Sequence, residues 1–209
     1  RIFQWFLDML NDGSYLNTGR DGDALRAAFV SGQVGMRIGS TGGIASTLED
    51  IGDRFELGVA FLPTPDGVER GGVVIGGGSI WMSKGFSEEE MEAAWKFLRH
   101  LTSPESTAYW HVNTGYFPID RRAYDLPEVK ALHEEFPHFR VAIDQLEASR
   151  QTYATQGAVI GVFPEARAAI EEAMEMVLLG RMSPQDALDM AAEEVTAAIR
   201  RYNIQAGLQ

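Results

Sequence analysis

Cysteine, long apolar runs and clustered positive charge are all missing from this 209-residue sequence. Without cysteine there is no disulfide, no thiol nucleophile and no thiolate metal ligand. No apolar run approaches the ~18 residues that a membrane span needs. Lys and Arg number 18 against 30 Asp and Glu, the acidic residues are spread along the chain, and the net charge is -12. Nucleic acids and anionic membranes bind clustered positive charge, so we expect neither as a partner.

The remaining composition is that of a folded globular protein. With 45% hydrophobic and 23% charged residues, the chain can bury the core of one large domain or of two small ones. It starts at Arg1 without an initiator methionine, and apolar residues such as Phe3 and Phe6 follow at once, as they would inside an amphipathic helix without a cap. We therefore expect a piece of a longer protein, with any targeting segment on the missing part.

Signatures of catalysis are missing as well. No phosphate-binding loop with Gly-Lys-Ser/Thr occurs, and Gly76-Gly77-Gly78 lacks the later glycine of a dinucleotide-binding fingerprint. Neither glycine-rich turn fits a nucleophile elbow, because Ile38 stands two residues before Ser40 and Trp81 two after Ser79. The histidines form no His-Glu-x-x-His pair, and we expect a surface or half-buried structural role for each: His100, His111, His133 and His138. The sequence therefore predicts no catalytic residue, no metal site and no cofactor.

The stretch 71–81 organises the sequence. Its apolar run Val73-Val74-Ile75 is typical of a buried strand, and three consecutive glycines interrupt it before Ser79-Ile80-Trp81. Glycine weakens a strand interior, so the break indicates a sharp bend, a hinge or the close approach of another molecule. We interpret this backbone, at Gly76, Gly77 and Ser79, as a surface against which a ligand lies.

A second glycine-rich turn is similar in kind. Residues 34–38 are predicted to form a strand that runs into Gly39-Ser40-Thr41-Gly42-Gly43, and a short helix is expected over 44–51. Such a turn commonly presents backbone N–H groups to an anion or a hydroxylated ligand, although a plain strand-to-helix turn explains the pattern equally well. A third strand is expected over 55–62, ended by the turn residues 63–67.

Helices account for most of the rest. Capping and turn signals place them at 2–11, 24–29 with Asp23 as the cap, 88–101 after a capping box at 87–90, 104–113, 124–136, 139–149, 163–179 and from 184 onward. Tyr116 lies in the loop after one of them, between Gly115 and Pro118. A tyrosine in such a loop is either a corner residue or a binding residue.

Several motifs, taken together and in this order, resemble a known family. They are the turn 39–43, the strand 57–63, the glycine motif 76–81, the helix motif 95–98, the loop 114–119 and the late segment 180–188. The chain resembles the C-terminal half of the extracellular solute-binding proteins of bacterial carbohydrate ABC importers, and most closely their glycerol-3-phosphate-binding branch. The resemblance covers nearly all 209 residues.

The resemblance implies an α/β, periplasmic-binding-protein-like fold of two lobes (class II type) that closes on its ligand around a hinge. Residues 1–72 and 119–209 would belong to the helix-rich C-terminal lobe, and residues 73–118 to the N-terminal lobe. The implied function is that of a receptor that binds a small carbohydrate or glycerol derivative and hands it to ABC permease membrane subunits. The implied location is periplasmic or extracellular, with a lipid anchor on the missing N-terminus as one option.

The resemblance also assigns binding residues. Ser40 matches the family's hydroxyl after the strand, Gly77 its backbone phosphate donor, and Tyr116 the tyrosine of its Thr-Gly-Tyr corner. Phe163 falls where sugar-binding relatives place a stacking aromatic ring, with core packing as the alternative. Neighbours in the two glycine-rich turns complete the expected ligand-binding set: Thr41, Gly42, Gly76 and Ser79.

One position departs from the family pattern. In the glycerol-phosphate-binding branch that this chain resembles, the late loop reads Gly-x-Arg-x-Gly, whereas this chain has Val159 between Gly157 and Gly161. Valine cannot donate the charged hydrogen bonds that a phosphate favours. This leaves room for a sugar or a phosphodiester. Two other classes stay open: a sugar-active hydrolase or transferase with Ser40 or Ser79 near a carboxylate, and a pure interaction domain without a cleft.

Overall fold

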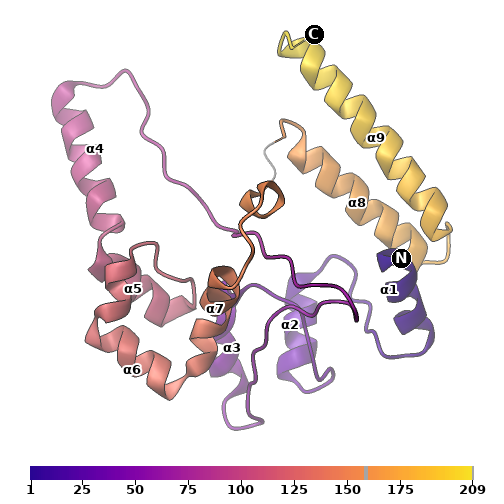
Figure 1. Ribbon diagram of the computed structural model, residues 1–209, viewed down its shortest axis with the longest axis horizontal. Helices are drawn as coiled ribbons and strands as arrows, with labels where there is room; N and C mark the ends of the chain where they lie inside the picture. The colour runs from indigo at the N-terminus through magenta and orange to yellow at the C-terminus, as the bar shows by residue number, and fades with distance from the viewer. Residues whose placement is uncertain (158–159, 209) are drawn as a thin grey trace. The chain divides into compact units, whose positions relative to one another are not determined.

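The computed structural model describes residues 1–157 and 160–208 (Figure 1). The chain divides into two compact units, one formed by Arg1–Gly35 with Ala158–Gln209 and the other by Met36–Gly157. Helices dominate both units. No helix in the described part of the chain is long and apolar enough to cross a membrane.

The first unit contains four helices in its described residues: α1 (Ile2–Asn11), α2 (Gly22–Val30), α8 (Phe163–Leu178) and α9 (Pro184–Gln205). Helices α8 and α9 lie side by side (Figure 1). Their shared core contains small residues that let the two backbones approach closely: Ala169, Ala173, Ala187 and Ala191. Phe3 of α1 and Val177 of α8 complete this core. Arg20 donates to the Glu175 carboxylate at 2.9 Å and ties the loop before α2 to α8.

Local capping sets where these helices begin. Helix α9 starts as predicted, with Pro184 in its first turn and the Ser183 hydroxyl accepting the backbone N–H of Asp186. The prediction that Asp23 caps α2 is wrong. The cap is Asp21, whose backbone is extended and whose carboxylate accepts the N–H groups of Asp23 and Ala24. Asp23 lies instead in the first turn of α2, where its negative charge interacts favourably with the positive end of the helix dipole.

The second unit carries α3 (Ile44–Ile51), α4 (Glu88–Leu101), α5 (Pro104–Thr114), α6 (Pro127–Glu135) and α7 (Val141–Glu147), with 3-10 turns η1 (Thr41–Gly43), η2 (Arg121–Asp125), η3 (Pro137–Arg140) and η4 (Tyr153–Gln156). The capping box of α4 forms as predicted between Ser87 and Glu90. A small buried cluster joins α5, η2 and α6 through Ala108, Ala123 and Val129.

Two predicted helices of this unit are each divided into a 3-10 turn and an α-helix. Tyr124 belongs to η2, and α6 starts only at Pro127, since Leu126 before that proline is extended. In the same way Phe139 lies in η3, and α7 follows from Val141. The predicted order of helices holds, but the prolines and 3-10 turns shorten the α-helices.

The strands predicted over 34–38, 55–62 and 71–81 are absent: no residue in the described part of the chain is in a β-strand. A strand needs a neighbouring strand to exchange backbone hydrogen bonds with, and side chains of α7 and the residues after it take that place here. The Leu62 N–H donates to the Gln145 side chain at 3.1 Å, and the Val73 N–H donates to the Ser149 hydroxyl at 3.0 Å. Leu62 and Val73 are therefore held by side chains of α7 and of Ser149 and not by a neighbouring strand.

Within the stretch 71–81, the backbone packs closely against other residues at Gly72, before the run of three glycines. A Cβ on Gly72 would lie 2.7 Å from the Thr155 side chain and 3.0 Å from the Ser149 Cβ, whereas Gly76, Gly77 and Gly78 have open space around them. The Arg150 N–H donates to the Gly71 carbonyl at 2.9 Å. Gly71 and Gly72 thus pack against the protein itself, and the later glycines remain exposed.

The α8 core gives a first prediction. Val177 is 1% exposed, so Val177→Ala removes two buried carbon atoms and should lower the free energy of unfolding by about 2 kcal/mol. Urea unfolding followed by circular dichroism measures the change. Glu172→Ala, on the exposed side of the same helix, is the control and should change stability by less than about 0.5 kcal/mol. Equal losses in the two variants would contradict this packing.

Candidate ligand-binding site

The end of α5 meets the η1 turn through two glycines. Gly115 ends α5 in the left-handed conformation, with φ of +104°, and a Cβ there would collide with the Thr41 carbonyl oxygen and the Ile44 side chain. Gly42 lies against the ring of Tyr116, where a Cβ would be 2.5 Å from Cε2 and 2.6 Å from Cζ. Neither position has room for a side chain, and both contacts bring Tyr116 to the turn 41–43.

The backbone of Tyr116 is fixed on both sides. Its N–H donates to the Thr114 hydroxyl at 3.1 Å, and its carbonyl oxygen lies 2.8 Å from Nδ1 of His111. The side chain is 46% exposed, and its hydroxyl forms no hydrogen bond within the described part of the chain. A rigid backbone thus carries a phenol that is open to an external partner.

Ser40 stands at the start of the η1 turn. Its hydroxyl oxygen accepts the Gly42 N–H at 3.2 Å, which leaves the hydroxyl proton for another acceptor. The segment before it is anchored by Arg37, which donates to the buried Thr47 hydroxyl of α3 at 3.1 Å. The structure therefore brings four of the predicted residues into one patch: Ser40, Thr41, Gly42 and Tyr116.

The other predicted residues of this unit lie in the open stretch. Gly76 and Gly77 are exposed, and Gly77 has a φ of +150° that side chains rarely adopt. The Ser79 hydroxyl accepts the indole N–H of Trp81 at 2.8 Å. No contact described here joins these residues to Tyr116. Their part in the site stays a prediction.

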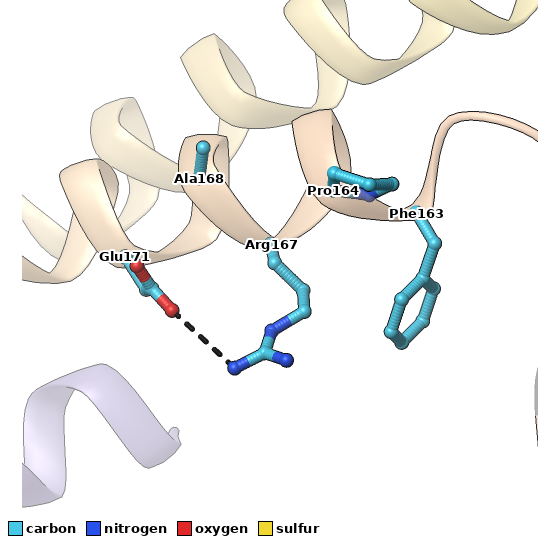
Figure 2. A pocket seen from close by; sticks show the side chains of 5 residues that line it. All are labelled: Phe163, Pro164, Arg167, Ala168 and Glu171. Atoms are coloured by element: carbon cyan, nitrogen blue, oxygen red, sulfur yellow. Dashed lines mark ion pairs between the residues drawn. The ribbon is translucent and has the colours of Figure 1, made fainter. Parts of the chain in front are cut away.

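Phe163 belongs to the other unit and begins α8. Figure 2 shows its ring beside a pocket whose lining also includes Pro164, Arg167, Ala168 and Glu171. The Arg167 guanidinium lies 3.8 Å from the Glu171 carboxylate. Phe163 is 42% exposed, which leaves a face of the ring accessible. Its role as a stacking residue stays a prediction, and Val159 lies outside the described residues.

Sequence reasoning missed two residues that support Tyr116. Trp110, 57% exposed on α5, has its ring 6.4 Å from the Tyr116 ring between centroids. His111 is fully buried, contrary to the surface or half-buried position expected, and its Nε2 lies 2.8 Å from Nε2 of His133 on α6. A histidine five residues before the loop tyrosine was the available signal, but its partner is 22 residues further on.

The surroundings of this histidine pair lower both pKa values. For His133 the pKa falls to about 4, mainly because of burial and then because of the charges of His111 and Arg140, while Asp144 acts in the opposite direction. Burial also lowers the pKa of His111, partly offset by its hydrogen bond to the Tyr116 carbonyl. Both rings are therefore neutral at pH 7.

A family model described as "Bacterial extracellular solute-binding protein" matches residues 1–137. The chain belongs to this family. It is 32% identical to the sn-glycerol-3-phosphate-binding periplasmic protein UgpB of Escherichia coli K12, over 93% of this chain and 44% of that protein. Against UgpB of Pectobacterium atrosepticum it is also 32% identical, over 95% of this chain and 45% of the relative.

A solved structure agrees with these sequence relatives. UgpB from Mycobacterium tuberculosis, in complex with glycerophosphocholine, superimposes with a TM-score of 0.72 at 26% identity, over 85% of this chain and 43% of that chain. The match confirms the α/β, periplasmic-binding-protein-like fold class, of which the described residues form a helix-rich part. The chain spans less than half the length of these relatives.

The Gly115 contact gives a second prediction. Gly115→Ala should lower the free energy of unfolding by about 3 kcal/mol, because the methyl group meets Thr41 and Ile44 and the left-handed φ adds strain. Gly85→Ala is a matched control, since Gly85 has a φ of +98° but open space around it, and it should cost only about 1 kcal/mol. Equal costs by urea denaturation would show that no close contact exists at Gly115.

The histidine pair gives a third prediction, on pH. Because the folded state holds both pKa values below the ordinary 6.5, the unfolded chain binds more protons, and stability should fall as pH drops from 6.5 towards 4. His133→Gln removes one titrating ring but keeps an amide donor, so its melting temperature should fall less steeply over this range. Thermal melts at half-unit pH steps give both slopes. Parallel curves for the two proteins would contradict the prediction.

Proposed function

We propose that this chain is part of a solute-binding receptor of an ABC import system, which binds a sugar or glycerol-phosphate-type solute and delivers it to the permease. The observation that carries the proposal is the Tyr116 phenol, whose backbone is clamped by Thr114 and His111 while its hydroxyl is left open. Binding sites of small polar solutes combine a few such pre-positioned polar groups with aromatic surface.

Each residue of the patch suits a hydroxylated ligand. Ser40 and Tyr116 offer hydroxyl groups that can donate to, or accept from, the hydroxyls of a sugar or of glycerol. Gly42 lets the Tyr116 ring lie directly on the turn. Outside this patch, the exposed backbone at Gly76 and Gly77 allows close approach of a ligand. In the other unit, the exposed Phe163 ring is of a kind that can cover the C–H face of a polyol.

The solute class follows from the relatives and from one departure. The relatives include proteins named for sn-glycerol-3-phosphate and a structure with glycerophosphocholine. Val159 stands where the family resemblance expects an arginine, and an arginine pairs strongly with the two free charges of a phosphomonoester. We therefore propose a phosphodiester of glycerol or a neutral sugar as the preferred solute.

The proposal is of a receptor and not of an enzyme. Among the described residues, the Ser40 hydroxyl contacts the Gly42 N–H and the Ser79 hydroxyl contacts Trp81, and neither is hydrogen-bonded to a histidine or carboxylate that could activate it. This geometry gives no support to a hydrolase or transferase. The receptor would act in the periplasm or at the outer cell surface, where a lipid anchor is one means of retention.

Calorimetry on the full-length protein tests the proposal. Three ligands are titrated separately: glycerophosphocholine, sn-glycerol-3-phosphate and maltose. We expect either glycerophosphocholine or maltose to bind most tightly. Tyr116→Phe should then raise the Kd about tenfold, the loss of one well-placed hydrogen bond to the ligand. Tyr109→Phe is the control: this exposed tyrosine lies on α5, the helix before the loop that carries Tyr116, and its substitution should leave the Kd unchanged. Unchanged affinity in Tyr116→Phe would contradict the proposed site.

A further inference from the structure

The loop that carries Tyr116 is held from its buried side at two carbonyl groups. Nδ1 of His111 lies 2.8 Å from the Tyr116 carbonyl oxygen, and the Tyr124 hydroxyl donates to the Pro118 carbonyl at 3.2 Å. Both of these side chains contact His133: the two histidine rings are edge to face at 5.1 Å between centroids, and the Tyr124 ring is 6.3 Å from that of His133. His133 thus touches both groups that hold the loop.

Hydrogen-bond chemistry fixes the proton positions in this chain of contacts. A carbonyl oxygen can only accept, so the proton of neutral His111 lies on Nδ1, and its Nε2 is an acceptor. The Nε2 of His133, at 2.8 Å, must then be the donor. A His133 ring that donates from Nε2 is compatible only with this tautomer of His111, so it reinforces the proton position that the Tyr116 carbonyl requires.

We propose that His133 is a positioning residue for solute binding: by fixing the tautomer of His111, it holds the Tyr116 carbonyl in place and so sets the affinity of the Tyr116 phenol for its ligand. The inference rests on the proposed function. His133 itself need not touch the solute, because it acts through the buried ring of His111, which is 0% exposed.

Charged and titratable neighbours define which proton states the pair tolerates. Besides His111 and Tyr124, the groups that act on His133 are Arg140 of η3 and Asp144 of α7, which are paired with each other at 2.8 Å, and Phe139 packs edge to face on His111. One added proton on Nδ1 of His133 keeps its Nε2–H donor and the clamp. A proton on Nε2 of His111 places two N–H groups face to face and breaks the pair.

Two substitutions separate positioning from simple structural support. His133→Leu removes the donor, so that His111 can take either tautomer, whereas His133→Gln keeps an amide N–H that can reach Nε2 of His111. With whichever of glycerophosphocholine, sn-glycerol-3-phosphate and maltose binds the wild-type full-length protein, His133→Leu should raise the Kd at least fivefold at pH 7.5. His133→Gln should restore it to within twofold of wild type. Circular dichroism confirms that each variant is folded at the temperature of titration.

A direct readout needs no ligand. Long-range nitrogen–proton NMR spectra of histidine-labelled protein should show His111 protonated on Nδ1 in the wild type and in His133→Gln, and a mixture of tautomers in His133→Leu. A folded His133→Leu variant with wild-type Kd, or His111 protonated on Nε2 in the wild type, would overturn the inference. If no probe binds the wild-type protein, the proposed function fails instead, and the NMR result still decides whether His133 fixes the tautomer.

Discussion

The candidate site depends on the contact of two bare backbones at the end of α5. Gly115 turns the chain with a left-handed φ and lies against Thr41 and Ile44, so that the Tyr116 ring comes down on Gly42. A Cβ at either glycine would separate the η1 turn from the tyrosine. The hydrogen bonds of Thr114 and His111 then remove the remaining freedom of the Tyr116 backbone, which keeps the entropy cost of ordering the site out of the binding step.

Side chains of one short helix, α7, and of Ser149, two residues after its end, hold two points of the chain that lacks regular structure in the second unit. Gln145 and Ser149 are both buried, and the side-chain oxygen of each accepts a backbone N–H from a segment that was predicted to be a strand. Because buried backbone groups must find partners, these contacts hold residues near 62 and 73 without any sheet. The bond to Val73 thereby fixes the chain three residues before the exposed glycines Gly76, Gly77 and Gly78.

What the sequence could predict was local. The capping box at Ser87 and the helix starts at Pro104 and Pro184 depend on residues within one turn and were predicted correctly, whereas the start of α6 at Pro127 was not. Strands depend on a distant partner, so their apolar pattern was insufficient, and Asp21 and Asp23 are of the same residue type, so either could be expected to cap α2. The family resemblance put Gly42 and Tyr116 in one expected binding set, but it did not predict their direct contact. The pairing of His111 with His133 did not, since nothing in the pattern connects α5 to α6.

The alanine seam between α8 and α9 has a mechanical consequence. Alanine has no rotamers, so Ala169, Ala173, Ala187 and Ala191 lose no side-chain entropy on packing and have no alternative arrangement to adopt. Larger side chains could change rotamer and let α8 and α9 shift relative to each other, whereas methyl groups in close contact cannot rearrange in this way. We therefore expect α8 and α9 to move together as one body, with Phe163 carried at the start of α8.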